Sequence, residues 1–435
     1  MGGKIMLSSD SRYQAYIDIL KEELVPAMGC TEPIAIAFAA AKAKSVLGCE
    51  PDRVEISVSG NIIKNVKSVV VPNTGGLKGI EAAAAAGLAV GNADKVLEVL
   101  ADVSEADKPR IKEFMHKVPM IVRPSSDTDV IFDIDITLHA GNDYSRLRIK
   151  DYHTNVVLIE KNGEMLFKAP EIELSSQGLT DRGLLTIKDI VDFADTVDLD
   201  DVREVLERQI EYNTAIANEG IRGHWGASVG RVLLDVYGYD VKIRAKAMAA
   251  AGSDARMSGC EMPVIIVSGS GNQGMAASLP VIVYAREYDV GEDKLLRSLC
   301  VSNLVTIHQK TWIGRLSAFC GAVNAGCGAG AGIAYLLGGG FDIVAHTLVN
   351  ALAIVSGIVC DGAKPSCAAK IASAVDAGIL GYQMYVRGME FQGGDGIISK
   401  GVENTIANIG RLGKDGMRET DREILKIMLQ NSNNE

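Results

Sequence analysis

The chain has 435 residues, enough for two or three domains and a large hydrophobic core. Hydrophobic residues make up 47% of the chain and charged residues 23%, which is typical of a globular protein. The net charge is -11 at pH 7 and no basic patch stands out, so we exclude nucleic acid as a partner.

The first part of the chain predicts two helices followed by strands. Residues 11–28 have the apolar spacing of a helix, with Pro26 near its end, and a second helix starts after Cys30. Residues 53–58 and 66–71 are rich in β-branched side chains and predict strands.

The pattern then changes twice. Residues 79–116 are rich in Ala, Leu, Glu and Lys and predict helices. Residues 119–168 predict strands, and the Asn-Gly pair within KNGE (161–164) is a hairpin signal. From residue 185 onward the chain is helical and rich in Ala, Gly and Ile.

These elements predict an α+β fold with a large, mostly helical domain and a smaller inserted α+β domain. We expect residues 50–175 to form the α+β domain and residues 176–435 to form the helical domain. The N-terminal helices, within residues 1–49, are expected to pack on the helical domain.

Two neighbouring segments, 320–340 and 341–360, are apolar enough to raise the question of a membrane. The second carries Asp342, His346 and Asn350, and a membrane span of this length should have few polar residues. We therefore expect buried core helices and no membrane. Because the first residues, MGGKIMLSSDSRYQ, lack the apolar core of a signal peptide, we expect a cytoplasmic protein.

The stretch AMGCTEP (27–33) places Cys30 just before a helix, since Thr31 can cap a helix and Pro33 suits its first turn. The free N–H groups and the dipole at a helix N-terminus stabilise a thiolate. Cys30 is therefore a candidate reactive cysteine, and the alternative is a small residue that fills a turn.

The stretch GSGNQG (269–274) matches the G-x-G-x-x-G dinucleotide fingerprint. Pro280 should interrupt the helix that would carry the pyrophosphate, and no βαβ alternation follows. The loop can equally bind a small carboxylate through backbone N–H groups, with Ser270, Asn272 and Gln273 as candidate substrate-binding residues.

A further turn, PNTGG (72–76), follows a predicted strand. Loops at strand ends often carry ligand-binding residues, so Asn73 and Thr74 are added as substrate-binding candidates.

The eight cysteines lie in a chain expected to occupy a reducing compartment, so we expect no disulfide framework. The spacing in Cys360-Asp-Gly-Ala-Lys-Pro-Ser-Cys367 is too wide for a CxxC redox motif and lacks the paired spacing of a zinc ribbon. Iron–sulfur clusters tolerate scattered thiolates. Cys320 is a candidate third ligand, although spacing alone cannot choose it over Cys327, and all of these cysteines can also be structural.

Several long motifs resemble those of the L-cysteine desulfidase family, which is related to the iron–sulfur L-serine dehydratases through their α-chain domain. They are GCTEPIAIAFAAAKA, AAGSDARMSG (250–259), SGSGNQG (268–274), AFCGAVNAGCG and VCDGAKPSCAAKI. The resemblance runs from about residue 10 to residue 430.

The resemblance implies a lyase with a [4Fe-4S] cluster and no pyridoxal phosphate, which converts L-cysteine to pyruvate, ammonia and hydrogen sulfide. It implies that Cys320, Cys360 and Cys367 bind the cluster in the helical catalytic domain, and that Cys30 accepts the substrate proton. A small amino acid is then the substrate, and the Gly/Ala-rich helices can support a homodimer.

Three alternatives remain open at this point. An L-serine dehydratase of the same mechanism would expel water in place of sulfide. A nicotinamide-dependent oxidoreductase would use the 269–274 loop. A metal-sensing or structural protein would hold a cluster and consume no amino acid.

Overall fold

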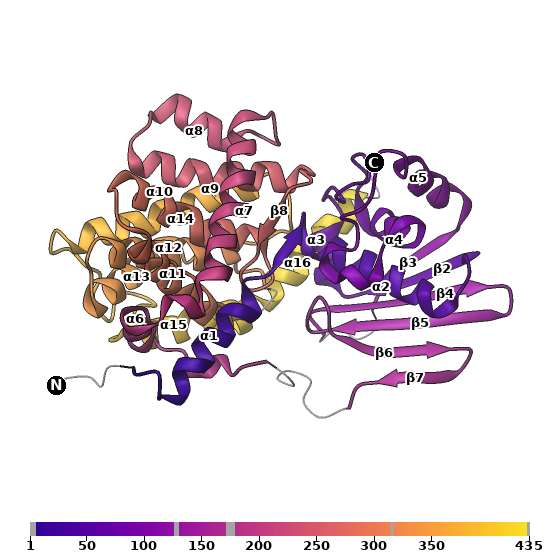
Figure 1. Cartoon of the computed structure of the whole chain (residues 1–435), viewed down its shortest axis with the longest axis horizontal. Helices are drawn as coiled ribbons and strands as arrows, with labels where there is room; N and C mark the ends of the chain where they lie inside the picture. Colours follow the sequence, from indigo (N-terminus) through magenta and orange to yellow (C-terminus); the bar gives the residue numbers. More distant parts are fainter. Residues whose placement is uncertain (1–5, 126–129, 171–178, 315–316, 433–435) are drawn as a thin grey trace.

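The computed structural model describes residues 6–125, 130–170, 179–314 and 317–432. It confirms the α+β fold class: a sheet domain and a helical domain lie side by side (Figure 1). The helices of the bundle enclose one large hydrophobic core, and a second core lies between the sheet and the helices that cover it.

The sheet domain contains a six-stranded sheet in the order β3-β2-β4-β5-β6-β7, with β2 and β3 parallel and the other pairs antiparallel. Its strands are β2 (Arg53–Val58), β3 (Met120–Pro124), β4 (Asp133–Ala140), β5 (Asp143–Lys150), β6 (Val156–Lys161) and β7 (Glu164–Lys168). The expected hairpin is confirmed, because β6 and β7 are joined by Asn162 and Gly163, both with positive φ.

The helices of this domain are α2 (Thr31–Leu47), α3 (Gly60–Val66), α4 (Gly79–Val90), η1 (Ala93–Glu98) and α5 (Lys108–Lys117). The strand predicted at 66–71 is wrong. Val66 ends α3, residues 67–69 form a turn, and Val70 makes only an isolated bridge with Lys78, because no described strand lies beside this segment.

The helical domain begins with α1 (Ser11–Glu23) and resumes after the sheet. Its other elements are η2 (Arg182–Leu184), α6 (Ile187–Thr196), η3 (Leu199–Asp201), α7 (Arg203–Arg222), α8 (Val229–Tyr237), α9 (Val241–Met257), α10 (Gly271–Glu287), α11 (Glu292–Ile313), α12 (Gly321–Leu336), α13 (Phe341–Val355), α14 (Cys367–Tyr385), α15 (Val402–Arg411) and η4 (Leu412–Gly416). The last helix, α16 (Arg418–Ser432), returns to the sheet domain and packs on α3.

The two apolar segments near residue 340 form α12 and α13, which are largely buried in this domain, as expected. None of the described helices is long and apolar enough to cross a membrane. Small residues in α12 let α14 approach closely: a Cβ on Gly330 would lie 2.6 Å from the carbonyl oxygen of Gly378. This close packing fixes the starts of α12 and α14 relative to each other.

The N-terminal segment divides differently from the expected 1–49 unit. The α1 helix packs in the core of the helical domain, but α2 packs between α4 and the strands β4 and β5 of the sheet domain. The reason is that α2 is apolar around most of its circumference, so it suits a position covered on two sides.

A two-stranded sheet that the sequence patterns did not reveal joins the segment before α2 to the helical domain. The strand β1 (Pro26–Met28) pairs antiparallel with β8 (Pro263–Ile265), which leads into the 269–274 loop. Two segments about 240 residues apart in the chain therefore meet next to Cys30.

Candidate active site

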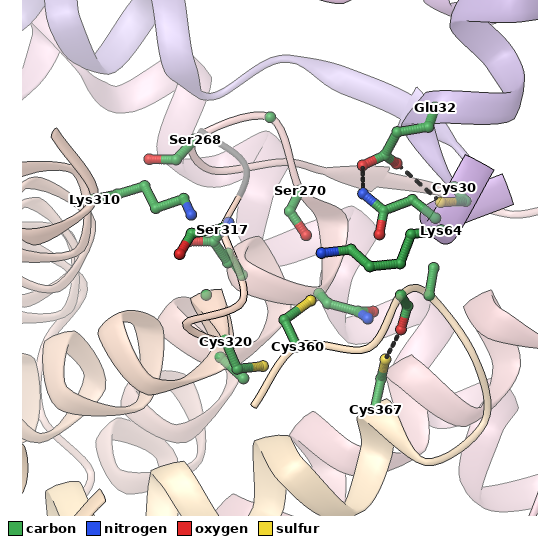
Figure 2. A pocket seen from close by; sticks show the side chains of 18 of the residues that line it. Cys30, Glu32, Lys64, Ser268, Ser270, Lys310, Ser317, Cys320, Cys360 and Cys367 are labelled. Carbon is green, nitrogen blue, oxygen red and sulfur yellow. Dashed lines mark hydrogen bonds between the residues drawn. The ribbon is translucent and has the colours of Figure 1, made fainter. Parts of the chain in front are cut away.

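A cavity of about 110 Å³ lies where the two domains meet. Residues from both domains line it, including the cysteines Cys30, Cys320, Cys360 and Cys367. Figure 2 shows Cys320, Cys360 and Cys367 on one side, Cys30 and Glu32 on the other, and Lys64 reaching between them in this view.

Cys30 is the N-cap residue of α2, at the position expected from the sequence. Gly29 before it has a φ of +58°, and a Cβ there would lie 2.1 Å from Cγ of Pro72, so only glycine fits this turn. Cys30 also packs in a small cluster with Val69 and Met257, against which Cys367 lies. The base candidate is thus held beside one of the proposed cluster cysteines.

The Cys30 thiol donates a hydrogen bond to Oε2 of Glu32, at 3.0 Å. The other carboxylate oxygen of Glu32 accepts from Nδ2 of Asn65, at 3.2 Å. Burial and then the Glu32 charge raise the pKa of Cys30 well above its usual value, although Arg256 acts in the opposite direction. Burial and the Glu32 carboxylate thus oppose the effect of the helix N-terminus and favour the neutral thiol.

Cys320 and Cys360 are brought together by a short antiparallel contact. The Cys360 N–H donates to the Ala318 carbonyl at 2.6 Å, and the Cys320 N–H donates to the Ile358 carbonyl at 3.2 Å. The neighbouring Cys320 thiol and the charge of Lys64 lower the pKa of Cys360, although its burial acts in the opposite direction. These neighbours therefore favour a thiolate at Cys360.

Cys367 starts α14, and its thiol donates to the Gly362 carbonyl at 3.6 Å. The turn between Cys360 and Cys367 packs on the backbone of α3: a Cβ on Gly362 would lie 2.3 Å from the Lys64 carbonyl oxygen. Cys327 does not line the cavity and is fully buried in α12. The cavity thus contains Cys320, which spacing alone could not choose over Cys327.

Three thiols, those of Cys320, Cys360 and Cys367, line one side of the cavity, and thiolates are the ligands that iron–sulfur clusters use. In a cluster each thiolate binds its own iron, so the sulfurs stand further apart than around a shared ion. Cys320, Cys360 and Cys367 could therefore hold a cluster at this side of the cavity.

The electrostatics of the cavity also favour an anionic group. The helices α2, α10, α12 and α14 all begin at its wall, and none of their N-cap side chains makes a capping hydrogen bond. Free N–H groups at helix N-termini favour negative charge. The cavity walls also include Lys64, Arg256 and Lys310, so thiolates and a carboxylate ligand would both be stabilised.

The 269–274 loop forms the start of α10 and contributes Ser270, Asn272 and Gln273 to the cavity, as expected from the sequence. Gln273 lies against the start of α12, since a Cβ on Gly321 would be 2.7 Å from its Cδ. The hydroxyl of Thr31 donates to the Gly269 carbonyl at 2.9 Å, which ties this loop to the turn that carries Cys30.

The same loop lacks the setting of a dinucleotide site. The strand before it, β8, pairs only with β1 among the described strands, and that pair is antiparallel. A dinucleotide fingerprint requires parallel strands around the loop. Pro280 lies inside α10, which continues to Glu287, so the expectation that it interrupts this helix is wrong. The antiparallel strand pairing still argues against a dinucleotide site.

Asn73 and Thr74 do not line the cavity. Nδ2 of Asn73 donates to the Leu100 carbonyl at 2.7 Å, and the Thr74 hydroxyl donates to the Val71 carbonyl at 2.7 Å. Both side chains are buried and shape their own turn. The PNTGG turn contributes to the site indirectly, because Pro72 packs against Gly29.

Sequence reasoning missed several polar residues of the cavity wall: Glu32, Lys64, Asn65, His153, Arg256 and Lys310. Glu32 and Arg256 lie within the motifs GCTEP and AAGSDARMSG, so the motifs offered a signal for them. The others come from segments with no distinctive spacing, and only the fold brings them to the cavity.

These features define a two-domain α+β protein with a thiol-rich, positively charged site between its domains. The family model described as serine dehydratase alpha chain matches residues 94–426. The chain belongs to this family, and the family points to a lyase of the dehydratase type.

Close relatives extend the match along the chain. UPF0597 proteins of Desulfitobacterium hafniense, Lachnoclostridium phytofermentans and Treponema denticola are 65%, 54% and 50% identical to it. The alignments cover 98%, 96% and 97% of this chain and 98%, 100% and 99% of the relatives. The chain is therefore also a member of the UPF0597 family over nearly its whole length.

Proposed function

We propose that the protein is an iron–sulfur-dependent lyase that eliminates the β-substituent of L-cysteine and forms pyruvate, ammonia and sulfide. The observation that carries the proposal is the convergence of Cys30, Cys320, Cys360 and Cys367 on one buried cavity. More than 300 residues separate the first from the last in the chain, so their convergence is a property of the fold.

The proposed cofactor is a [4Fe-4S] cluster held by Cys320, Cys360 and Cys367. Three protein ligands would leave one iron open, and such an iron supplies Lewis acidity toward the leaving group when the cluster is bound. The chain's own residues support this assignment through the helix N-termini and the cations around the three thiols.

The proton transfer is assigned to Cys30 and Glu32. Cys30 Sγ takes the proton from Cα of the substrate, the electron pair forms the Cα–Cβ double bond, and the Cβ–sulfur bond breaks to release sulfide. The enamine product tautomerises to an imine, and water hydrolyses it to pyruvate and ammonium. Since burial and the Glu32 charge raise the pKa of Cys30 and favour its thiol, we assign Glu32 Oε2, at 3.0 Å, as the acceptor that frees the thiolate.

The second candidate is L-serine dehydration by the same residues, and the family description favours it. The cysteine proposal draws on the resemblance of the motifs around Cys360 and Cys367 to those of the L-cysteine desulfidase family. Both reactions suit a reducing compartment, since all eight cysteines are free, and we propose the cytoplasm.

The test is anaerobic purification followed by measurement of iron, acid-labile sulfide and visible absorption. Pyruvate release is then assayed with L-cysteine and with L-serine, with sulfide release in parallel and without added pyridoxal phosphate. Sulfide and pyruvate in equal amounts from L-cysteine support the proposal. Turnover of L-serine alone would replace it by the dehydratase, and a protein without iron after anaerobic reconstitution would remove both.

A further inference from the structure

Arg256 is a buried cation whose role none of the motifs explains. It is the penultimate residue of α9, lines the cavity and is 2% exposed. Its Nη1 donates to Oδ1 of Asn272 at 3.2 Å, while its Nε is buried without a hydrogen-bond partner. Throughout the ranges that the structure describes, Arg256 forms no ion pair with a carboxylate.

The guanidinium lies at the start of α10. A Cβ on Gly271 would be 2.5 Å from Nε and 2.9 Å from Cζ of Arg256, so this glycine makes room for the guanidinium. The N-cap side chain of α10, Ser270, makes no capping hydrogen bond. The guanidinium of Arg256 therefore lies beside the first turn of α10, whose N-cap side chain leaves the first N–H groups uncapped.

A buried charge without a partner is costly, and a planar guanidinium is best satisfied by a carboxylate that accepts two hydrogen bonds. Among the described residues, the only hydrogen bond of the guanidinium is to the Asn272 side chain, and its acceptor is a neutral amide oxygen. Asn272 thus orients the arginine rather than neutralising it, which leaves the anionic partner to come from a ligand.

We propose that Arg256, together with the first turn of α10, binds the α-carboxylate of the substrate. The identity of the substrate rests on the proposed function, but a carboxylate site does not. The Thr31 hydrogen bond to Gly269 fixes the Cys30 turn to the same loop. The carboxylate anchor and the proton acceptor are thereby held at a constant separation, which orients Cα toward Cys30.

The experiment compares two probes that share a thiol and differ in one charged end. Binding of 3-mercaptopropionate, which keeps the carboxylate, and of cysteamine, which lacks it, is measured by calorimetry on the anaerobic, cluster-loaded protein. In Arg256→Gln the affinity for 3-mercaptopropionate is expected to fall about 10–100-fold, since a charged hydrogen bond is lost. Cysteamine affinity and iron content are expected to stay within about twofold.

Two further variants keep the test decisive. Arg256→Lys retains the charge without the planar fork, so it is expected to lose part of the 3-mercaptopropionate affinity and to keep its iron even if the glutamine variant does not. Arg146→Gln removes an arginine that pairs with Asp135 in the sheet domain, and it is expected to bind both probes as the unmodified protein does.

Equal losses for the two probes in Arg256→Lys, or no loss for either, would overturn the proposal, as would the failure of the unmodified protein to bind 3-mercaptopropionate. Because binding is measured without turnover, these outcomes are separate from those of the proposed function. Loss of carboxylate affinity in a protein that degrades neither L-cysteine nor L-serine would keep the anchor and reject the reaction.

Discussion

At the scale of single residues, Cys30 combines opposing influences. Its place at the start of α2 favours a thiolate, but burial and the carboxylate of Glu32 favour the thiol and raise its pKa. The second influence is larger because Cys30 is almost fully buried and because Glu32 accepts its hydrogen bond at 3.0 Å. If Cys30 is the base, Glu32 is therefore the neighbouring group placed to take the thiol proton.

Replacing Cys30 with serine tests this role directly. The hydroxyl keeps the shape of the turn and a donor for Glu32, but serine is a far weaker acid than cysteine. Turnover is expected to fall by about 10²–10⁴-fold, the usual contribution of a general base. Iron content and visible absorption are expected to remain, because Cys30 is not among the proposed cluster ligands.

Cys49→Ser is the matched control, since Cys49 is exposed and lies outside the cavity. It is expected to turn over at the normal rate. Pyruvate formation by Cys30→Ser at a rate similar to that of the control would exclude Cys30 as the base.

The sequence predicted the cavity residues that lie in recognisable motifs, and it did not predict those that only the fold brings to the cavity. The motifs named Cys30, Cys320, Cys360, Cys367 and the 269–274 loop, all of which line the cavity. Asn73 and Thr74 were chosen only for their place after a predicted strand, and their side chains hydrogen-bond to backbone carbonyls. Lys64 lies in no distinctive motif, and only its burial in the folded chain brings it to the cavity.

At the scale of secondary-structure elements, the close crossing of α12 and α14 positions two of the proposed ligands. Cys320 immediately precedes α12 and Cys367 begins α14, so the distance between the two thiols depends on how these helices meet. At their crossing, Gly330 faces Gly378 with room for no side chain: a Cβ on Gly330 would be 2.7 Å from the Gly378 Cα.

Gly330→Ala is therefore expected to force the two helices apart. Inserting a methyl group into a packed crossing typically costs about 1–3 kcal/mol of stability. The expected result is a lower melting temperature together with weaker retention of iron during anaerobic dialysis, because the ligands at the helix ends move.

Gly340→Ala serves as the control for the general effect of alanine, since a Cβ at that position meets no atom within 4 Å. It is expected to leave both stability and iron unchanged. If Gly330→Ala were clearly destabilised but retained iron normally, the crossing of α12 and α14 would not control the position of the proposed cluster ligands.

The docking of α8 on α9 leads to a pH-dependent prediction. Asp254 on α9 is fully buried; one of its oxygens accepts from the Gly230 N–H of α8 at 3.1 Å, and the other has no partner. Burial raises the pKa of Asp254 to about 6. Between the unfolded pKa of about 3.9 and this value the folded state binds more protons, so stability falls as pH rises.

Asp254→Asn should remove this loss, because the amide is neutral and keeps an oxygen for the Gly230 N–H. The free energy of unfolding is expected to rise by about 1–3 kcal/mol at pH 8 and to change little at pH 4. Urea denaturation at the two pH values measures the difference. An equal effect at both would show that packing, not charge, controls this position.

The sequence predicted helices and strands correctly where local residue preferences determine the structure, and it failed where tertiary contacts determine it. The Asn162-Gly163 hairpin follows from positive φ at both residues, which is a local property. The β-branched run at 66–71 has no strand beside it for most of its length, so its composition was misleading. The short strands β1 and β8 exist only because each pairs with the other, and no pattern within either segment signals that partner.

At the scale of the whole molecule, the cavity depends on the contact between the two domains. The sheet domain supplies Cys30, Glu32, Lys64 and Asn65, and the helical domain supplies the three proposed ligands, Arg256 and the 269–274 loop. The α16 helix, shown in yellow in Figure 1, crosses back from the helical domain to the sheet domain. Its residue Leu425 packs against the core of the sheet domain.

The ion pair between Lys64 of α3 and Asp421 of α16 connects the α16 helix to the cavity wall. The Lys64 side chain is 2% exposed and that of Asp421 is 23% exposed, so the pair is largely shielded from water. Lys64 also lowers the pKa of Cys360 by its charge. The C-terminal helix thereby holds a cation that acts on the proposed cluster ligands from the opposite domain.

Asp421→Asn is expected to weaken the packing of α16 on α3. Removing one member of a buried ion pair leaves an unpaired charge and costs about 3–5 kcal/mol when burial is complete, so a smaller cost of about 1–3 kcal/mol is expected for this partly exposed pair. Hydrogen exchange should become faster in α3 and α16, while α12 and α14 keep their protection, because those helices pack on each other in the helical domain.

The control is Glu419→Gln on the same helix, where Glu419 pairs with Arg422 at the exposed surface. Exposed pairs of this kind contribute little to stability, so exchange in α3 should not change. If Asp421→Asn and Glu419→Gln gave the same exchange pattern, Lys64 would be held in the cavity by its own helix. Faster exchange in α3 and α16 of Asp421→Asn alone would instead mean that the ion pair with α16 holds Lys64 in the cavity.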